Sequence, residues 1–133
     1  MEIIELNEKY VEKYLDIIKQ LSIYSKISND KLVKIKNRKI YIIIKDELVI
    51  GTGSIFLLKK YHCKNICQIE DLVIDKDYRR NGYGIKLLEF LINEGKKYNC
   101  YKIMLDCKDE NLPFYKKLNF NITGNNISLY LTF

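Results

Sequence analysis

The sequence predicts a single α+β domain in which a largely antiparallel sheet is followed by a βαβ unit. Apolar runs bounded by turn residues recur between residues 39 and 75, which is typical of neighbouring antiparallel strands. From residue 83 the apolar positions recur at helical spacing, and a further apolar run begins at residue 101. A chain of 133 residues is long enough to bury one core without disulfides or metals.

The first half of the chain is expected to hold four strands and two helices. Residues 2–6 ("EIIEL") predict a strand, and a helix from Asn7 has apolar positions at Tyr10, Tyr14, Ile17, Ile18 and Leu21. Residues 28–30 ("SND") are typical of a cap before a short second helix at residues 31–36. Residues 39–45 and 48–61 predict a hairpin through the turn "DE", and residues 65–75 predict the next strand.

The second half is expected to alternate between helices and strands. A helix running to about Tyr98 has a buried stripe formed by Leu87, Leu88, Leu91 and Ile92. Residues 101–107 predict a strand, and residues 111–118 a short helix that tolerates a proline in its first turn. The runs "FNIT" (120–123) and "ISLYLTF" (127–133) predict closing strands. The complete order is βααβββαβαββ.

Charge and composition restrict the classes of partner. The formal net charge of +6 suits nucleic acid, an acidic membrane surface or a phosphorylated small molecule. A compositional bias is the alternative, because Lys, Asn, Ile and Tyr are abundant together, and no dense Lys/Arg block indicates a nucleic-acid-binding tail. An acidic N-terminus and the lack of a membrane-length apolar stretch predict a cytoplasmic protein.

The four cysteines are expected to be reduced thiols in that compartment. Cys63 and Cys67 lie beside His62, but a convincing second pair of ligands is missing. We therefore expect no metal site.

The stretch "YRRNGYG", residues 78–84, joins the apolar run "LVI" to the long helix. Glycines let a ligand approach the backbone, and a helix N-terminus presents free N–H groups at the positive end of its dipole. With Arg79 and Arg80 alongside, these features predict a phosphate or pyrophosphate site. The stretch is neither a Walker A loop nor a dinucleotide fingerprint, because it lacks GKS/GKT and three spaced glycines. An ordinary turn with surface arginines is the alternative.

This R-x-x-G-x-G joint, followed by a helix, a strand and "NLPFYKKLNF" (111–120), resembles the GNAT superfamily of acetyl-CoA-dependent N-acetyltransferases. The segments "IEDLVID", "NCYKIMLDC" and "FYKKLNF", with "KKYH" and "QLSIYSKIS" upstream, resemble the eukaryotic-type glucosamine-6-phosphate N-acetyltransferases. The resemblance implies a GNAT fold, whose mixed, mostly antiparallel central sheet carries helices on both faces. It also implies acetyl transfer from acetyl-CoA to the amine of glucosamine 6-phosphate, a step in UDP-N-acetylglucosamine biosynthesis.

The resemblance also implies site residues. Those that would bind coenzyme A are Leu72, Val73, Ile74, Arg79, Arg80, Asn81, Gly82, Tyr83, Gly84, Asn111, Tyr115, Lys116 and Lys117. Those that would contact the sugar phosphate are Ser22, Lys59, His62, Glu70, Asp71, Tyr101 and Lys102. Such enzymes are homodimers with the acceptor site at the interface, so part of this set is expected to act from the neighbouring chain. Two departures from the family pattern concern the phosphate end of the acceptor: a loop one residue shorter before Glu70, and Tyr130 in place of a basic residue.

Direct acetyl transfer in a ternary complex needs a neutral amine, a polarised thioester and a proton for the departing thiolate. Asp106, at the end of its strand, is the candidate to orient the amine and help remove its proton, with Glu70 as a second carboxylate. Backbone N–H groups near residues 72–74 are candidates to bind the developing oxyanion. Tyr115 is the candidate proton donor, and none of the cysteines needs a nucleophilic role.

Each of these residues could instead have a purely structural role, and other functions are also open. Tyr115 could be a packed aromatic, Asp106 a turn cap and His62 a loop residue without a role. At the level of function, the alternatives are a GNAT enzyme for a polyamine, an antibiotic or a protein amine, and a non-catalytic nucleic-acid-binding module. No RNP-like motif, basic helix or zinc knuckle supports the nucleic-acid alternative.

Overall fold

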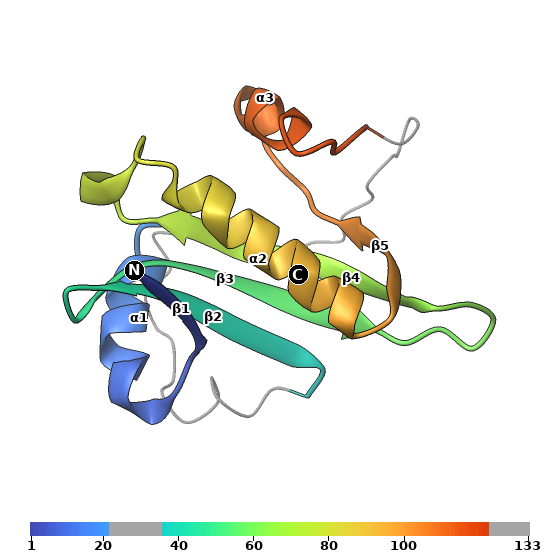
Figure 1. The fold of residues 1–133 in the computed structure, drawn as a ribbon, viewed down its shortest axis with the longest axis horizontal. Helices are drawn as coiled ribbons and strands as arrows, with labels where there is room; N and C mark the ends of the chain where they lie inside the picture. The colour runs from blue at the N-terminus through green and yellow to red at the C-terminus, as the bar shows by residue number, and fades with distance from the viewer. Residues whose placement is uncertain (22–35, 123–133) are drawn as a thin grey trace, which may run out of the picture.

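The computed structural model of the chain describes residues 1–21 and 36–122 (Figure 1). Within them, five strands form one sheet in the order β1-β2-β3-β4-β5. The strands are β1 (Glu2–Glu5), β2 (Arg38–Lys45), β3 (Leu48–Leu58), β4 (Asn65–Ile74) and β5 (Cys100–Met104). The helices are α1 (Val11–Ile18), α2 (Tyr83–Lys97) and α3 (Leu112–Lys116), with 3-10 turns η1 (Glu8–Tyr10), η3 (Lys76–Tyr78) and η4 (Asp109–Asn111).

Strands β1 to β4 are antiparallel neighbours, and β5 runs parallel to β4. The two-residue turn between β2 and β3 is short enough for an antiparallel hairpin. The parallel pair β4–β5 instead needs a crossover, which α2 supplies. The mixed, mostly antiparallel sheet expected from the sequence is therefore confirmed.

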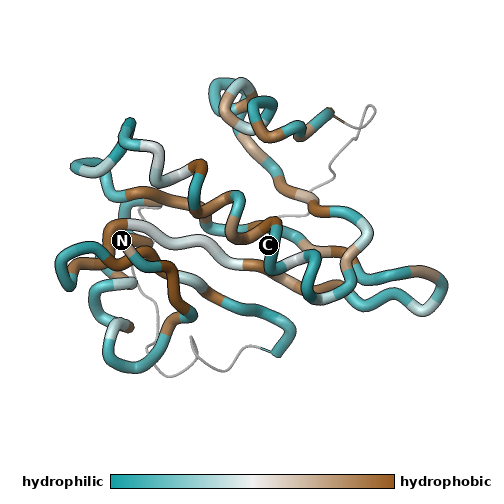
Figure 2. Tube along the Cα trace, in the orientation of Figure 1, coloured by the Kyte–Doolittle hydropathy of each residue, from teal (hydrophilic) through white to brown (hydrophobic). Residues whose placement is uncertain are grey.

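Two helices cover opposite faces of the sheet. Alternate side chains of β2 point to opposite faces, so Ile40 and Ile42 pack with Tyr14 of α1, while Tyr41 and Ile43 pack with Leu87 and its neighbours on α2. Of the four residues expected in the buried stripe of α2, Leu87, Leu88 and Leu91 are fully buried and Ile92 is half-buried. Figure 2 shows the hydrophobic stretches of α2 beside those of the strands, whereas the tip of the β3–β4 hairpin is mostly hydrophilic.

A β-bulge interrupts β4 between the residues that pair with Thr52 and Ser54. Thr52 pairs with Val73 but Ser54 pairs with Glu70, so β4 carries one extra residue there. Asp71 within this bulge has a left-handed backbone with φ of 53°, which is uncommon for a residue with a side chain. The last pair between β4 and β5 is Gln68–Met104, so from Ile69 onward β5 no longer covers the outer edge of β4.

Several expected boundaries differ from the structure. The second strand of the hairpin ends at Leu58 and not at residue 61, because residues 59–64 form the turn into β4. Strand β5 ends at Met104 and not at residue 107, since its pairing with β4 ends at Gln68. Helix α3 is shorter than residues 111–118, with a 3-10 turn ahead of it. Residues 120–122 are not in a strand, which corrects the described part of that expectation; the remaining closing strand and the short second helix before Lys36 lie outside the described residues.

One carboxylate is buried in the α2 layer. Glu94 is 9% exposed, and its Oε2 accepts a hydrogen bond of 3.1 Å from the Tyr41 hydroxyl. Its Oε1 accepts a bond of 2.7 Å from Lys97 Nζ. Buried charges are stable only when such partners are present. Within the described residues, no helix is both long and apolar enough to cross a bilayer.

Replacing Tyr41 by Phe should lower the free energy of unfolding by about 1–3 kcal/mol at pH 7, because the Glu94 carboxylate loses a buried donor. Urea denaturation measures the change. Tyr101→Phe is the control, since Tyr101 is 52% exposed and its loss should change stability by less than about 0.5 kcal/mol.

Tyr41→Phe should also change how the stability of the protein depends on pH above 10. Burial, reinforced by Glu94, raises the pKa of Tyr41 above its usual value of 10.0, so the unfolded chain ionises first as the pH rises. The stability that depends on the neutral phenol is complete below pH 10 and is lost above it. The wild type should therefore lose stability above pH 10 more steeply than Tyr41→Phe; parallel curves would contradict this.

Candidate active site

The divergence of β5 from β4 opens a groove of about 750 Å³ beside the bulge. One wall is β4 from Ile69 to Ile74, and the other is the segment that leaves β5 toward α3 (Figure 1). Leu105, Asp106, Cys107, Lys108, Glu110, Asn111 and Tyr115 line that second wall. Gln20 and Leu21, after α1, and Arg79 complete the lining. Among the polar residues that the sequence singled out, the groove gathers Glu70, Asp71, Arg79, Asp106, Asn111 and Tyr115.

The bulge projects two adjacent carboxylates at this groove. Glu70 Oε1 accepts a hydrogen bond of 2.6 Å from Gln68 Nε2. Asp71 Oδ2 accepts one of 2.8 Å from Arg38 Nη2. Acidic residues inside an apolar strand need such partners, and here an amide and a guanidinium supply them. Both residues line the groove, and their role in binding a substrate stays a prediction.

Sequence reasoning missed Arg38, which contacts this acid pair from two strands away. Arg38 is the first residue of β2 and stands among several lysines in the sequence. In such a segment, a basic residue is expected to be an exposed side chain at the end of a strand. One signal was available: Arg38, Ile40 and Ile42 share a face because side chains alternate along a strand. That face is the one covered by α1, where a charge needs a partner.

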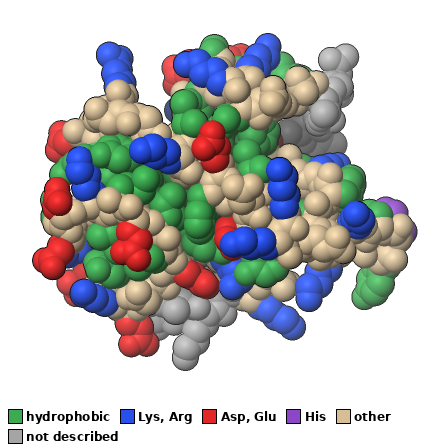
Figure 3. Space-filling view, viewed as in Figure 1, with side chains coloured by type: hydrophobic (Ala, Val, Ile, Leu, Met, Phe, Trp, Pro, Cys, Tyr) green, Lys and Arg blue, Asp and Glu red, His purple; other side chains and the backbone are tan. Residues whose placement is uncertain are grey.

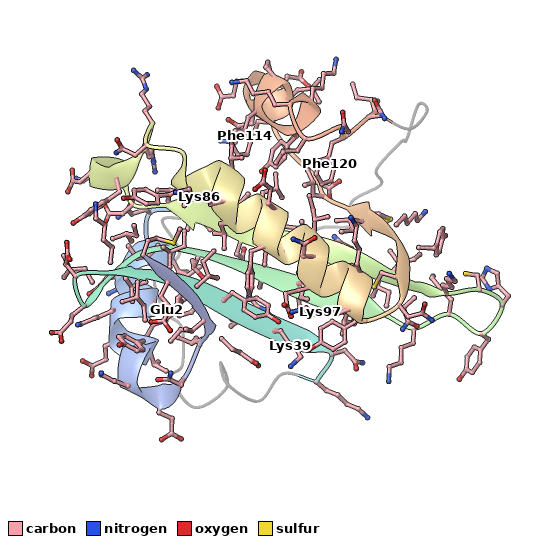
Figure 4. All side chains as sticks on the ribbon, viewed as in Figure 1. Glu2, Lys39, Lys86, Lys97, Phe114 and Phe120 are labelled. Atoms are coloured by element: carbon pink, nitrogen blue, oxygen red, sulfur yellow. The ribbon has the colours of Figure 1, made fainter. Side chains whose placement is uncertain are left out.

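Tyr115 lies at the α3 side of the groove, held by two aromatic neighbours. Its ring meets Phe114 edge-on with centroids 5.0 Å apart, and Phe120 with centroids 6.0 Å apart. Figure 4 shows Phe114 and Phe120 directed from this segment toward α2. Burial, with a smaller contribution from Cys107, raises the pKa of the Tyr115 hydroxyl above 10.0. The phenol therefore stays protonated near neutral pH and can donate a proton.

Asp106 lines the same groove, but it lies two residues beyond the end of β5 at Met104 and not at the strand end expected from the sequence. The groove thus holds a protonated phenol on one wall and carboxylates on both walls. Such an arrangement can remove a proton from one group and supply a proton to another.

The loop between β4 and α2 is shaped by two left-handed residues, Arg80 with φ of 65° and Gly82 with φ of 81°. Asn81 stabilises this shape by donating from Nδ2 to the carbonyl oxygens of Tyr78 and Arg79 at 3.2 Å. Helix α2 starts at Tyr83, and the first amide bonded back to the loop is that of Lys86, to the Gly82 carbonyl at 3.2 Å. The N–H groups of the first turn are therefore free to bind an anion.

The two glycines of this loop have different roles. A side chain at Gly82 would meet nothing within 4 Å, so glycine is needed for the positive φ and leaves the backbone open to a ligand. A Cβ at Gly84 would lie 3.3 Å from the Phe114 ring, so this glycine allows α3 to approach α2. Arg79 Nε donates to the Ile74 carbonyl at 2.9 Å, which occupies one of the β4 backbone groups expected to face a cofactor.

Several expected site residues lie outside the groove. Lys59 and His62 lie on the β3–β4 hairpin, beyond the end of β4 that is opposite the bulge. The only histidine of the chain marks this tip at one edge of the molecule in Figure 3. Tyr101 and Lys102 line a separate hollow along β5, which shares only Leu105 and Asp106 with the groove. Lys116 and Lys117 follow Tyr115 without lining the groove, and Ser22 and Tyr130 lie outside the described residues.

In residues 1–21 and 36–122, no three His, Cys, Asp or Glu side chains are grouped so that they could hold a metal ion. His62 and Cys63 are both on the exposed hairpin, whereas Cys67 is buried under α2. These three residues therefore do not form a common ligand set.

Comparison with known proteins agrees with this geometry. Residues 4–120 match the acetyltransferase (GNAT) family. A curated relative, glucosamine 6-phosphate N-acetyltransferase 1 of Dictyostelium discoideum, is 32% identical over 126 residues, which is 93% of this chain and 73% of the relative. The glucosamine 6-phosphate N-acetyltransferase of Schizosaccharomyces pombe is 35% identical over 68% of this chain and 86% of its own length.

Solved structures give the same fold. The crystal structure of glucosamine-6-phosphate N-acetyltransferase from Arabidopsis thaliana superposes with a TM-score of 0.86 at 26% identity, covering 98% of each chain. A Trypanosoma brucei acetyltransferase superposes with a TM-score of 0.87 at 26% identity, covering 98% of this chain and 99% of that one. The fold class expected from the sequence is thereby confirmed, and the chain belongs to the GNAT family of acetyltransferases.

Proposed function

We propose that this chain transfers the acetyl group of acetyl-CoA to the amine of glucosamine 6-phosphate, giving N-acetylglucosamine 6-phosphate and CoA. One observation carries the proposal: a single groove joins the Glu70–Asp71 bulge, Asp106 and Tyr115 at the uncovered edge of β4. The names of the curated relatives support the choice of acceptor.

Acetyl-CoA fits the groove as an added strand. Beyond Gln68 the outer edge of β4 lacks β5 as a partner, so the main-chain groups of residues 72–74 that point away from β3 are available to the pantetheine arm, apart from the Ile74 carbonyl that Arg79 occupies. The pyrophosphate would rest on the free N–H groups at the start of α2, with Arg79 and Arg80 adding positive charge. Asn111 and Tyr115 would then flank the thioester. Lys116 and Lys117, outside the groove, would reach only the outer part of the cofactor.

The reaction balances with the groups present. The amine nitrogen bonds to the thioester carbonyl carbon, whose oxygen becomes negative and is stabilised by N–H groups at the β4 bulge. Asp106, with Glu70 beside the acceptor, accepts the proton that the nitrogen loses. As the C–S bond breaks, the electron pair leaves with sulfur. Tyr115 donates its phenolic proton to that sulfur, so CoA leaves as a thiol. The phenol then recovers a proton from solvent.

The difference in pKa between Tyr115 and the CoA thiol determines where the Tyr115 hydroxyl must lie during the reaction. A thiol has a pKa of about 8.5, whereas that of Tyr115 is raised above 10. Proton transfer to a fully formed thiolate is therefore uphill, and contact between the phenol and the sulfur is required while charge develops. The groove satisfies this requirement if the thioester lies against α3.

The proposal includes a cytoplasmic homodimer that works in UDP-N-acetylglucosamine biosynthesis. Lys59 and His62 are too far along the β3–β4 hairpin to serve the groove of their own chain. In a dimer, this hairpin would supply the basic side chains for the sugar phosphate of the neighbouring copy. Tyr101 and Lys102, on β5, would lie near the same interface.

Acceptor selectivity tests the proposal. The phosphate of glucosamine 6-phosphate can accept charge-assisted hydrogen bonds worth about 1.5–3 kcal/mol each. We expect kcat/KM for this acceptor to exceed that for glucosamine by about 100-fold or more. Steady-state release of the CoA thiol across glucosamine 6-phosphate, glucosamine, spermidine and an aminoglycoside measures this. Equal rates for both sugars, or a preference for another amine, would contradict the phosphate-specific activity.

Tyr115→Phe tests the proton donor. Loss of the phenol should reduce kcat by about 10²- to 10⁴-fold and leave acetyl-CoA affinity nearly unchanged, because the ring packing is retained. Since the pKa of Tyr115 is raised above 10, its ionisation should reduce wild-type kcat only above pH 10. Tyr10→Phe, whose ring contacts lysines at the start of α1, is the matched control. An active Tyr115→Phe enzyme would remove Tyr115 from this role.

Gly82→Val tests the pyrophosphate site. The new side chain would force strain at φ of 81° and enter the open space above the loop, so acetyl-CoA affinity should fall by about 10-fold or more. Asn99→Val strains a left-handed residue of φ 58° just after the other end of α2, which makes it a control for stability alone. Calorimetric titration of acetyl-CoA should show reduced affinity only for Gly82→Val. Similar affinities for both variants would place the pyrophosphate elsewhere.

A further inference from the structure

Arg38 lies deep on the α1 side of the sheet, although it opens a strand. Its side chain is 13% exposed, and its guanidinium carbon lies 5.2 Å from the centroid of the Phe56 ring. Nη2 donates to Asp71 Oδ2 at 2.8 Å and approaches Ser54 Oγ at 3.5 Å. The side chain therefore reaches across β3 and ends at the bulge in β4.

These contacts connect Arg38 to both acidic residues of the bulge, Glu70 and Asp71. It bonds the Asp71 carboxylate directly. Ser54, the second neighbour of the guanidinium, donates from Oγ to the Glu70 carbonyl at 3.1 Å. Asp71 occupies an uncommon left-handed conformation, which persists only where surrounding contacts hold it. Arg38 and Ser54 provide such contacts on the face of the bulge turned away from α2.

Stability alone is a poor explanation for this arrangement. Arg38 Nε is buried without a hydrogen-bond partner, and a buried ion pair is often no more stable than apolar residues of similar volume. Burial raises the pKa of Tyr14 of α1, with Arg38 opposing the shift and Asp71 adding to it. Three strands, β2, β3 and β4, therefore meet at one guanidinium–carboxylate contact on the sheet face that α1 covers.

The Asp71 carboxylate faces the groove as well as Arg38. The Asp71 side chain retains 45% exposure and lines the groove next to Glu70. Arg38 occupies Oδ2, and Oδ1 has no partner within the described residues. Neutralisation of one of two adjacent carboxylates also reduces their mutual repulsion. Arg38 thus leaves one oxygen of Asp71 available, in a fixed position, for a donor on a bound molecule.

We propose that Arg38 is a positioning residue for the amine acceptor. It touches neither substrate; it holds the Asp71 carboxylate and the β4 bulge so that Asp71 Oδ1 and Glu70 can accept hydrogen bonds from the acceptor. This inference rests on the proposed acetyl transfer, since it assigns the acceptor to the bulge side of the groove.

Steady-state kinetics with Arg38→Met, Arg38→Lys and Asp71→Asn tests the proposal. Arg38→Met should lower kcat/KM for the acceptor by about 10-fold or more, while the KM for acetyl-CoA stays within about 2-fold. Arg38→Lys, which retains the charge but not the planar fork, should recover part of the loss. In the Asp71→Asn background, Arg38→Met should have little further effect, because residues that act as a unit are not additive.

Lys39→Met is the matched control. Lys39 is the next residue of β2, and its ion pair with Glu5 at 3.6 Å lies away from the groove. Figure 4 places Lys39 near Lys97, at the C-terminal end of α2. This variant should leave the kinetics for both substrates unchanged. Equal losses for acceptor and acetyl-CoA in Arg38→Met, or additive effects of Arg38→Met and Asp71→Asn, would overturn the proposal.

A measurement without substrate separates this proposal from the proposed function. Amide hydrogen exchange of the β3–β4 pairs that flank the bulge, Thr52–Val73 and Ser54–Glu70, should quicken by about 10-fold or more in Arg38→Met but not in Lys39→Met. Unchanged exchange would overturn the positioning role whatever the acceptor. If the wild type does not acetylate glucosamine 6-phosphate but acetylates another amine, only the choice of acceptor is contradicted. The kinetic test of Arg38 is then made with that amine. If Arg38→Met does not fold, Arg38→Lys replaces it in both measurements.

Discussion

The extra residue in β4 is the constraint on which the site depends. Pairing of β4 with β5 ends at Gln68–Met104, and the bulge follows on β4 between Glu70 and Val73. The end of the pairing leaves the outer edge of β4 uncovered, and the bulge, at the same place, sets the direction of Glu70 and Asp71. The open groove and the acidic residues that line it therefore meet on one short stretch of β4.

The two layers of the domain contribute differently to this site. The α2 layer is apolar apart from the Glu94 group, and it fixes the helix N-terminus at the end of β4. The α1 layer is polar where it meets the bulge, with Arg38, Ser54, Gln68 and Glu70 on one face. In the proposed mode of binding, helix geometry therefore defines the end of the groove that takes the cofactor, and side-chain charge defines the end that takes the acceptor.

Much of the fold followed from the sequence because its signals are local. The stripe of Leu87, Leu88 and Leu91 and the glycine-bearing joint before Tyr83 depend on spacing within a few residues. The bulge did not follow, because "IEDLVID" shows only that two acids interrupt an apolar run, and the slip of register depends on pairing with β3. Arg38 was missed for the same reason: its partner is 33 residues away. Lys59 and His62 were grouped with the acceptor residues through family resemblance, and the structure of one chain places them on a distant hairpin.

The contrast between the two ion pairs with buried members shows why Arg38 matters for function. Glu94 is on the buried face of α2, and Lys97 follows three residues along the same helix, so the pair forms wherever that helix forms. The Arg38–Asp71 pair instead spans two strand-to-strand steps and can form only when β2, β3 and the bulge are all in register. Such a pair adds little to the free energy of folding, because the cost of removing both charged groups from water offsets their electrostatic attraction. In the role proposed for Arg38, the pair instead fixes the position of the Asp71 carboxylate, since a small displacement there would weaken the alignment of the amine with the thioester.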